Sequence, residues 1–275
     1  MPSWNVHTAH VQRLLREGRP QDYGVRDVNA FLFGNFVPDI YLGYMVKEPS
    51  GILPYRLTHF ADPGHIPIPR AQEFWDTYVE PTLHVPDDVP LGQADITLDE
   101  GVAISRAGGS FVIPPSRECH EALLKRLAAP DYRASDMTLG AGAHLLCDNT
   151  YNTATHAWLD TYHVPTGERT RIRKQGDFDK FGRTLPVTLT CEATDELYAQ
   201  ALAFPQYRIH AVDVPRTLDV SNGIVANNQA RHITGTPEYS LFTEEFFLEV
   251  FEHACELMTA QLRGYATRLA ERGLA

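Results

Sequence analysis

Cysteine is scarce in this sequence, and its cysteines are never closely spaced. The 275 residues include four of them, Cys119, Cys147, Cys191 and Cys255, with no Cys-x2-Cys pair. Both a disulfide-stapled scaffold and a cysteine-based zinc site need closely patterned cysteines. Neither is indicated, so we expect reduced and mostly buried thiols.

Long apolar runs and basic residues are also in short supply. No run is long enough to span a bilayer, and residues 1–7 (MPSWNVH) lack the basic and apolar regions of a secretory signal. We therefore expect a soluble, cytoplasmic protein.

With 24 Lys and Arg against 35 Asp and Glu, the formal net charge is −11. This charge repels nucleic-acid backbones and anionic membranes, so nucleic acid is not an expected partner and small molecules are favoured.

The length suffices for one large domain with its own hydrophobic core, and neither a strong linker nor an internal repeat divides the chain. We therefore expect a single domain over residues 1–275. The excess of acidic residues has two alternative interpretations. It could be a net negative surface that favours solubility, or it could reflect a site that gathers carboxylates to hold divalent cations.

Apolar spacing predicts an all-α fold with long irregular loops. Residues 7–17 are amphipathic, and residues 27–36 are apolar on nearly every side until Pro38 stops the helix, which places Asp39 just past a buried helix end. Further helical patterns cover residues 70–83, 135–151, 177–184, 192–203 and 243–271.

Residues 84–115 interrupt the helical pattern. They contain several Pro and Gly residues and the short β-like runs ADITL, GVAIS and SFVIPP. This composition predicts a loop insertion with a small β-hairpin. Helical spacing resumes at Ser116, a suitable N-cap, with Cys119 in the first turn.

The most informative segment is residues 135–151 (SDMTLGAGAHLLCDNTY), which predicts a central helix with Ser135 as its N-cap. His144 and Asp148 are four residues apart, so both lie on one face, one turn from each other. Imidazole nitrogen and carboxylate oxygen suit zinc, with manganese or iron as alternatives. Such a pair alone is often structural, but its apolar neighbours predict burial, and a buried Asp needs a strong partner.

Two more candidate ligands lie in irregular segments. Asp39 follows the apolar run FLFGNFVP, and a solvated loop aspartate is the alternative interpretation. His59 stands between Leu57 and Phe60 in or beside a loop, and it fits a hydrogen-bonded structural histidine equally well. Neither residue is sufficient by itself to indicate a metal site.

Four motifs in order give the sequence its resemblance to a known family. They are HTAHVQRLL at residues 7–15, GNFVPD at 34–39, HF at 59–60 and HLLCD at 144–148. In this order they resemble the zinc-dependent phospholipase C family and the single-strand nucleases of the same helical fold. The motifs and their surroundings cover about a quarter of the chain.

Position by position, the resemblance implies a two-zinc site. Asp39, His59, His144 and Asp148 would hold one ion, and Asp148 would bridge to a second ion held also by His7. Asp39 is the residue that we expect to orient or deprotonate the attacking water.

The resemblance leaves a third metal unassigned. The secreted phospholipases bind a metal through a mature N-terminal Trp, whereas Trp4 is internal here, and they bind another through two further His and a Glu. The candidates for this role are Asn152, His156, Asp177, and His253 with Glu249 or Glu256. Asp177 and His253 fit a cap or a surface group equally well, and His10 fits a position behind the ligands or a packing role.

The function expected from these features is phosphoester hydrolysis by metal-activated water. The substrate would be a phospholipid headgroup or a soluble phosphodiester or monoester, and Arg171, Arg173 and Arg183 are candidates for contacting its phosphate. The alternative is a non-catalytic protein that uses the metal cluster for stability. A phosphohydrolase of the type marked by an adjacent His-Asp dipeptide is disfavoured because the sequence has none. The oligomeric state stays open.

Overall fold

The computed structural model describes residues 2–83, 102–106, 109–113 and 132–274, and it confirms the all-α fold class. The helices, in chain order, are α1 (Trp4–Glu17), the 3-10 turn η1 (Pro20–Tyr23), α2 (Val28–Gly34), α3 (Val37–Ile40), α4 (Tyr55–His59), α5 (Ala71–Tyr78), the 3-10 turn η2 (Glu80–Leu83), α7 (Asp136–Thr161), α8 (Glu168–Thr184), α9 (Asp195–Leu202), α10 (Asp213–Ala230) and α11 (Glu244–Glu271). In the part of the chain just defined, no helix is both long and apolar enough to cross a membrane.

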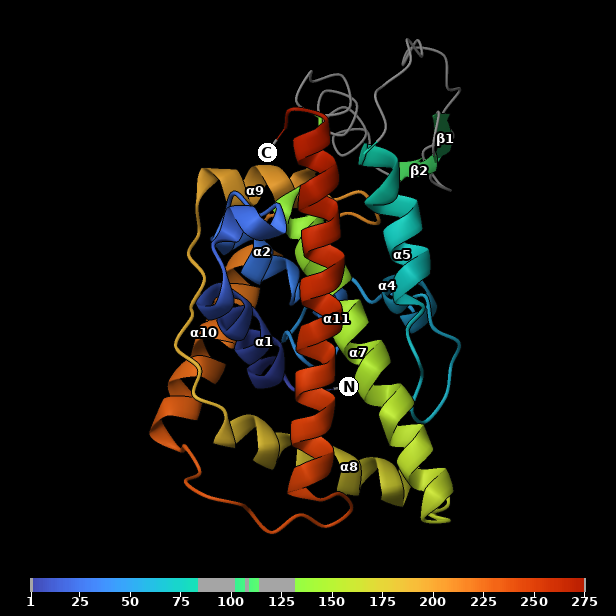
Figure 1. The fold of residues 1–275 in the computed structure, drawn as a ribbon, viewed down its shortest axis with the longest axis vertical. Helices are drawn as coiled ribbons and strands as arrows, with labels where there is room; N and C mark the ends of the chain where they lie inside the picture. Colours follow the sequence, from blue (N-terminus) through green and yellow to red (C-terminus); the bar gives the residue numbers. More distant parts are fainter. Residues whose placement is uncertain (1, 84–101, 107–108, 114–131, 275) are drawn as a thin grey trace.

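The helix α7 lies at the centre of the fold. Figure 1 shows it (yellow-green) beside the long C-terminal helix α11 (red), and helices α2, α3 and α5 also pack against it. Ser135 caps its first turn by accepting a hydrogen bond from the Thr138 amide at 3.1 Å, as the sequence predicts. Because α7 is covered on several sides, its polar side chains are buried together with its apolar ones.

Two glycines allow α2 to approach α7 very closely. The Cα atoms of Gly34 and Gly140 face each other, and a Cβ built on Gly140 would collide with the backbone carbonyl of Phe31. A backbone atom cannot move aside as the end of a flexible side chain can. Glycine is therefore required at this crossing, which also positions the C-terminal end of α2 against the N-terminal part of α7.

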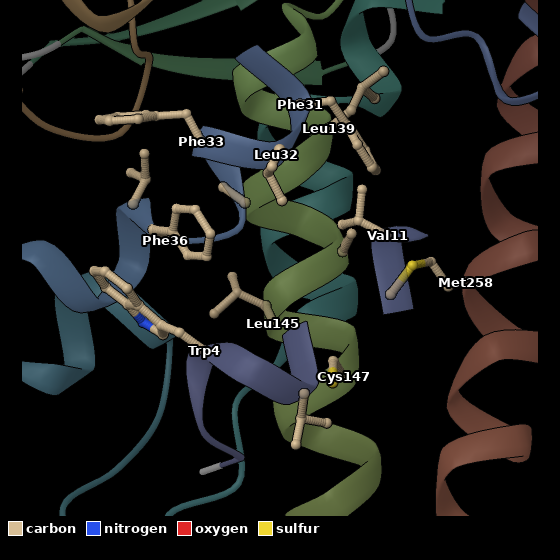
Figure 2. Packing of buried hydrophobic residues seen from close by; sticks show 14 of the residues in the cluster. Trp4, Val11, Phe31, Leu32, Phe33, Phe36, Leu139, Leu145, Cys147 and Met258 are labelled. Carbon is tan, nitrogen blue, oxygen red and sulfur yellow. The ribbon is translucent and has the colours of Figure 1, made fainter. Parts of the chain in front are cut away.

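The hydrophobic core fills both sides of α7. Figure 2 shows Trp4 and Phe36 close together on one side, where their ring centroids are 4.6 Å apart, and Val11 and Met258 on the other. All four side chains are at most 2% exposed. Burial of such large side chains is the main source of stability in a helical fold of this kind. One contiguous cluster of buried residues extends from α1 to α11, whereas the single-domain assignment itself stays a prediction.

The predicted hairpin is present as β1 (Val102–Arg106) and β2 (Gly109–Ile113), an antiparallel pair in which Val102 is opposite Ile113 and Arg106 is opposite Gly109. The remainder of the predicted insertion at 84–115, and the predicted N-cap at Ser116 with Cys119, lie outside the described residues.

Several helix boundaries differ from the predictions. The prediction that Pro38 stops a helix is wrong, because α2 already ends at Gly34 and Pro38 belongs to the first turn of α3, where a missing amide proton costs little. The central helix continues for ten residues beyond Tyr151, and α8 begins at Glu168 rather than near Asp177.

Helix α10 was not predicted at all. Its sequence, DVPRTLDVSNGIVANNQA, contains a proline, a glycine and many polar residues, so it carries little helical signal of its own. The proline falls in the first turn, where it is tolerated. Packing of buried side chains such as Val214, Leu218 and Val225 stabilises the helix instead.

The close crossing of α2 and α7 gives a stability prediction. We expect Gly140→Ala to lower the free energy of unfolding by about 2 kcal/mol or more because the new methyl group meets the backbone of α2. Gly176→Ala in α8 is the matched control, since nothing lies within 4 Å of its added Cβ, and it should be neutral or stabilising by up to about 1 kcal/mol. Urea unfolding measures both, and equal stabilities of the two variants would contradict the prediction.

Candidate metal centre

His144 and Asp148 project from one face of α7 into the interior, and both are fully buried. His144 Nδ1 lies 2.7 Å from the carbonyl oxygen of Asn35 at the end of α2. A carbonyl only accepts, so Nδ1 carries the proton and Nε2 keeps a lone pair. This lone pair is directed into the site, where Nε2 is 3.7 Å from Asp148 Oδ2. The imidazole is thus already in the tautomer that binds a metal.

His59 is the last residue of α4 rather than a loop residue. The chain turns there because Phe60 adopts a left-handed conformation with φ 53°. His59 Nδ1 hydrogen-bonds with the Thr58 hydroxyl at 2.8 Å, and its Nε2 lies 3.3 Å from His144 Nε2. Tyr55 stacks on the ring at 4.0 Å. When Nδ1–H donates to Thr58, both histidines present nitrogen lone pairs to the same small space.

Asp39 reaches this space from the one-turn helix α3. Its Oδ1 lies 3.5 Å from His59 Nε2, and its Oδ2 accepts a hydrogen bond of 2.8 Å from the indole Nε1 of Trp4. Trp4 is the first residue of α1, so this bond orients the carboxylate from a separate helix. Sequence reasoning missed Trp4 in this role because its partner is 35 positions away.

His7 approaches from α1 and packs against His144. The two rings stack at 4.0 Å with an interplanar angle of 8°, and His7 Nε2 lies 3.3 Å from Asp148 Oδ1. This contact does not have the geometry of a hydrogen bond. Both ring nitrogens of His7 are buried, and neither has a hydrogen-bond partner. The two ring nitrogens of His7 therefore lie in the interior without the hydrogen-bond partner that a buried polar atom normally has.

The structure thus brings together all five residues proposed as ligands, from four helices. Two groups have ligand atoms within 4.8 Å of one another, and they share His144: His7, His144 and Asp148, and Asp39, His59 and His144. Asp39 Oδ1 and Asp148 Oδ1 are buried without a hydrogen-bond partner, as is His7. Unsatisfied buried acceptors are costly, and a bound cation would satisfy them. These groups could hold a metal ion, and their nitrogen and oxygen atoms suit zinc.

Burial and mutual contact set the protonation states that metal binding needs. Burial lowers the pKa of His7 to about 4 and also lowers that of His59. Burial alone would raise the pKa of Asp39 and Asp148, but the imidazoles beside them, His144 foremost, outweigh it and hold both values below normal. At neutral pH His7 and His59 are therefore neutral while both carboxylates are ionised, which leaves buried negative charge that a cation would compensate.

Two of the candidates for a third metal, Asn152 and His156, extend the ligand-bearing face of α7 but serve another purpose. The Asn152 amide donates to the carbonyl of Pro67 at 2.8 Å, and His156 Nε2 donates to that of Ile66 at the same distance. Their side chains hold the segment before α5 against α7 rather than joining the two ligand groups.

The other two candidates lie apart from the cluster as well. Asp177 accepts the amide hydrogens of Ser240, Leu241 and Phe242 at 2.6–3.1 Å, so it anchors the segment that leads into α11. His253 is exposed, with Nδ1 3.9 Å from Glu256. No third group of ligands appears among the residues with described positions.

His10 lies one turn beyond His7 but does not contribute to the two groups. Its Nδ1 is 3.1 Å from Cys255 Sγ, its Nε2 is 3.2 Å from the Tyr151 hydroxyl, and its ring stacks on Phe251. Both nitrogens are occupied within the core. Burial lowers the pKa of His10 to about 3, so it is a neutral packing residue.

A pocket of about 790 Å³ opens next to the cluster, and Asp39 forms part of its wall. Trp4, Tyr44 and Tyr55 give it aromatic surface. Two of the three arginines proposed for phosphate contact, Arg171 and Arg183, line the pocket, as does Lys174. The third, Arg173, donates instead to the carbonyl of Ser240. Of the five proposed ligands, Asp39 is the one that borders this pocket.

Comparisons with known proteins add nothing to this geometry. No family model matches the chain, and searches of curated proteins and of solved structures give no match either.

The ligand groups give a direct prediction about metal content. Asp148→Asn keeps the size of the side chain but removes the carboxylate that lies beside His7, His59 and His144, so we expect zinc content after dialysis to fall to below about a tenth of wild type. The zinc-dependent increase in melting temperature should fall with it. Elemental analysis and thermal melting measure these effects. Asp160→Asn, on the exposed side of the same helix, is the control. Wild-type zinc content in Asp148→Asn would refute the assignment.

His10 gives a pH prediction that does not involve the ligands. Its folded pKa is below the unfolded value of 6.5, so its stabilising contribution is present above about pH 6.5 and is lost as pH falls toward about 3. Chelator-treated protein should lose free energy of unfolding between pH 6 and pH 5. We expect this loss to be smaller by about 1 kcal/mol in His10→Phe than in the wild type. Urea unfolding at both values tests this, and an unchanged pH slope in His10→Phe would contradict it.

Proposed function

We propose that this protein is a metal-dependent phosphoester hydrolase that resembles the zinc-dependent phospholipase C family. One observation carries the proposal: a buried cluster of ionised carboxylates and neutral imidazoles, with unsatisfied ligand atoms, opens onto a pocket lined by cationic side chains. The ordered motifs that resemble the family supply the residues of this cluster, which further supports the proposal.

The cluster suits two ions bridged by Asp148. Asp39, His59, His144 and Asp148 would hold one ion, while His7 with Asp148 would hold the other. When bound, zinc supplies acidification of water and compensation of the negative charge that develops on phosphorus.

Asp39 is the residue best suited to handle the water. Its Oδ2 is held by the Trp4 indole, its Oδ1 has no hydrogen-bond partner, and it lines the pocket. A carboxylate fixed in this way can orient the water that a bound ion would acidify. Arg171 and Arg183, on the pocket wall, can bind the phosphate oxygens.

The alternative is a metal site that only stabilises the fold. The cluster joins α1, α3, α4 and α7, so a bound ion would crosslink four helices in either case. The opening of the cluster onto the pocket favours catalysis, because purely structural zinc sites are closed by protein ligands.

Hydrolysis of bis(p-nitrophenyl) phosphate by zinc-loaded protein tests the proposal. We expect turnover that a chelator abolishes and zinc restores, and that His144→Ala lacks. If zinc raises the melting temperature but no phosphodiester or phosphomonoester is hydrolysed, the structural role is correct and the proposal is wrong.

The Trp4 hydrogen bond sharpens this test. Trp4→Phe removes the donor to Asp39 and keeps an aromatic ring beside Phe36, so we expect kcat to fall about tenfold with zinc content unchanged. Trp158→Phe loses a comparable bond to the carbonyl of Leu241 and should retain wild-type kcat.

A further inference from the structure

The pocket beside the cluster differs in charge from the chain as a whole. The chain has a formal net charge of −11, yet helix α8 places Arg171, Lys174 and Arg183 on the pocket wall. The carboxylates on that wall are Asp39, which belongs to the cluster, and Asp179, whose pKa burial raises. Cationic groups gathered in one concave site attract an anionic ligand.

Lys174 is the most unusual of these cations. Its side chain is only 4% exposed, and its Nζ donates to the Asn152 side-chain oxygen at 3.1 Å and lies 5.1 Å from the centre of the Phe178 ring. Among the described residues, the ion pairs made by α8 involve Arg171 and Lys180, and none includes Lys174. A buried ammonium without a counter-charge is costly and is rarely kept without a function.

The contact with Asn152 fixes where this charge lies. Asn152 follows Asp148 by four residues on α7, so their side chains are neighbours on one face, one turn of about 5.4 Å apart. Burial lowers the pKa of Lys174, whereas the charge of Asp148 raises it, as expected for groups at this separation. Lys174 is therefore held beside Asn152, the residue one helical turn beyond Asp148 on the face of α7 that carries His144 and Asp148.

We propose that the pocket selects phosphoesters that carry a second anionic group, with the ester phosphate at the metal cluster and the second group on Lys174. This inference rests on the proposed function and specifies its substrate class. The second group is a phosphate or a carboxylate, since both accept the charge-assisted hydrogen bonds that an ammonium donates. Arg171 lies one turn before Lys174 on α8 and lines the same pocket, although Glu168 pairs with it at 2.6 Å.

Binding of non-hydrolysable phosphonates to the zinc-loaded protein tests the proposal without turnover. Propylphosphonate has one anionic group, phosphonopropionate adds a carboxylate, and propylenebisphosphonate adds a phosphonate. By calorimetry, with zinc content verified after each titration, we expect at least one of the two doubly anionic ligands to bind about tenfold more tightly than propylphosphonate. The two ligands distinguish a carboxylate from a phosphate as the second group.

Variants of the pocket residues test whether the preference for doubly anionic ligands arises in the pocket. Lys174→Met should abolish the tenfold advantage in affinity. Arg171→Gln changes an exposed position and serves as the second variant should Lys174→Met fail to fold; it should reduce the advantage about threefold. Arg169→Gln removes the same charge from α8 outside the pocket and should preserve the advantage.

Equal affinity for the three ligands, or an advantage that persists in both pocket variants, would overturn this proposal alone, provided that the phosphodiester is hydrolysed. A Lys174-dependent preference without any hydrolysis would instead support a doubly anionic ligand and refute the hydrolase function.

Discussion

The rest of the structure depends on how two carboxylates are kept ionised in the interior. Asp39 and Asp148 are at most 1% exposed, and no Lys or Arg among the described residues forms an ion pair with either of them. Imidazoles surround them instead, and burial lowers the pKa of His7 and His59, so these two rings supply little positive charge at neutral pH. A divalent cation would compensate the buried carboxylates, which is why the cluster indicates a metal site more strongly than any of its residues does alone.

Precise placement of the ligands comes from the helices behind them. The carbonyl of Asn35 sets the tautomer of His144, and Asn35 follows Gly34, whose contact with Gly140 brings α2 against α7. Two glycines with no chemistry of their own therefore determine which nitrogen of His144 faces the site. Trp4 performs the same task for Asp39 from α1. Ligand geometry in such a site is a consequence of helix packing.

The sequence predicted the parts of this structure that depend on local patterns. The Ser135 cap, the turn-spaced pair on α7 and the all-α class follow from spacing, and the ordered motifs selected the five residues that the fold brings together. Long-range contacts could not be read in this way. The bond from Trp4 to Asp39 spans 35 positions, and Lys174 reaches Asn152 across 22. Helix α10 was missed because tertiary packing overrides its poor intrinsic propensity.

The position of Asp39 connects the buried charge with the proposed chemistry. His7 and His144 stack inside the protein and have no route to solvent, whereas Asp39 belongs to the cluster and also forms the wall of the pocket. A site that only crosslinked helices would gain nothing from this opening, since water would compete for the ion. Lys174 extends the same asymmetry, because it places positive charge on the pocket wall beside Asn152, which follows Asp148 by one turn of α7. With cations bound among the carboxylates, both parts of the proposed site would be positive, as a phosphoester with a second anionic group requires.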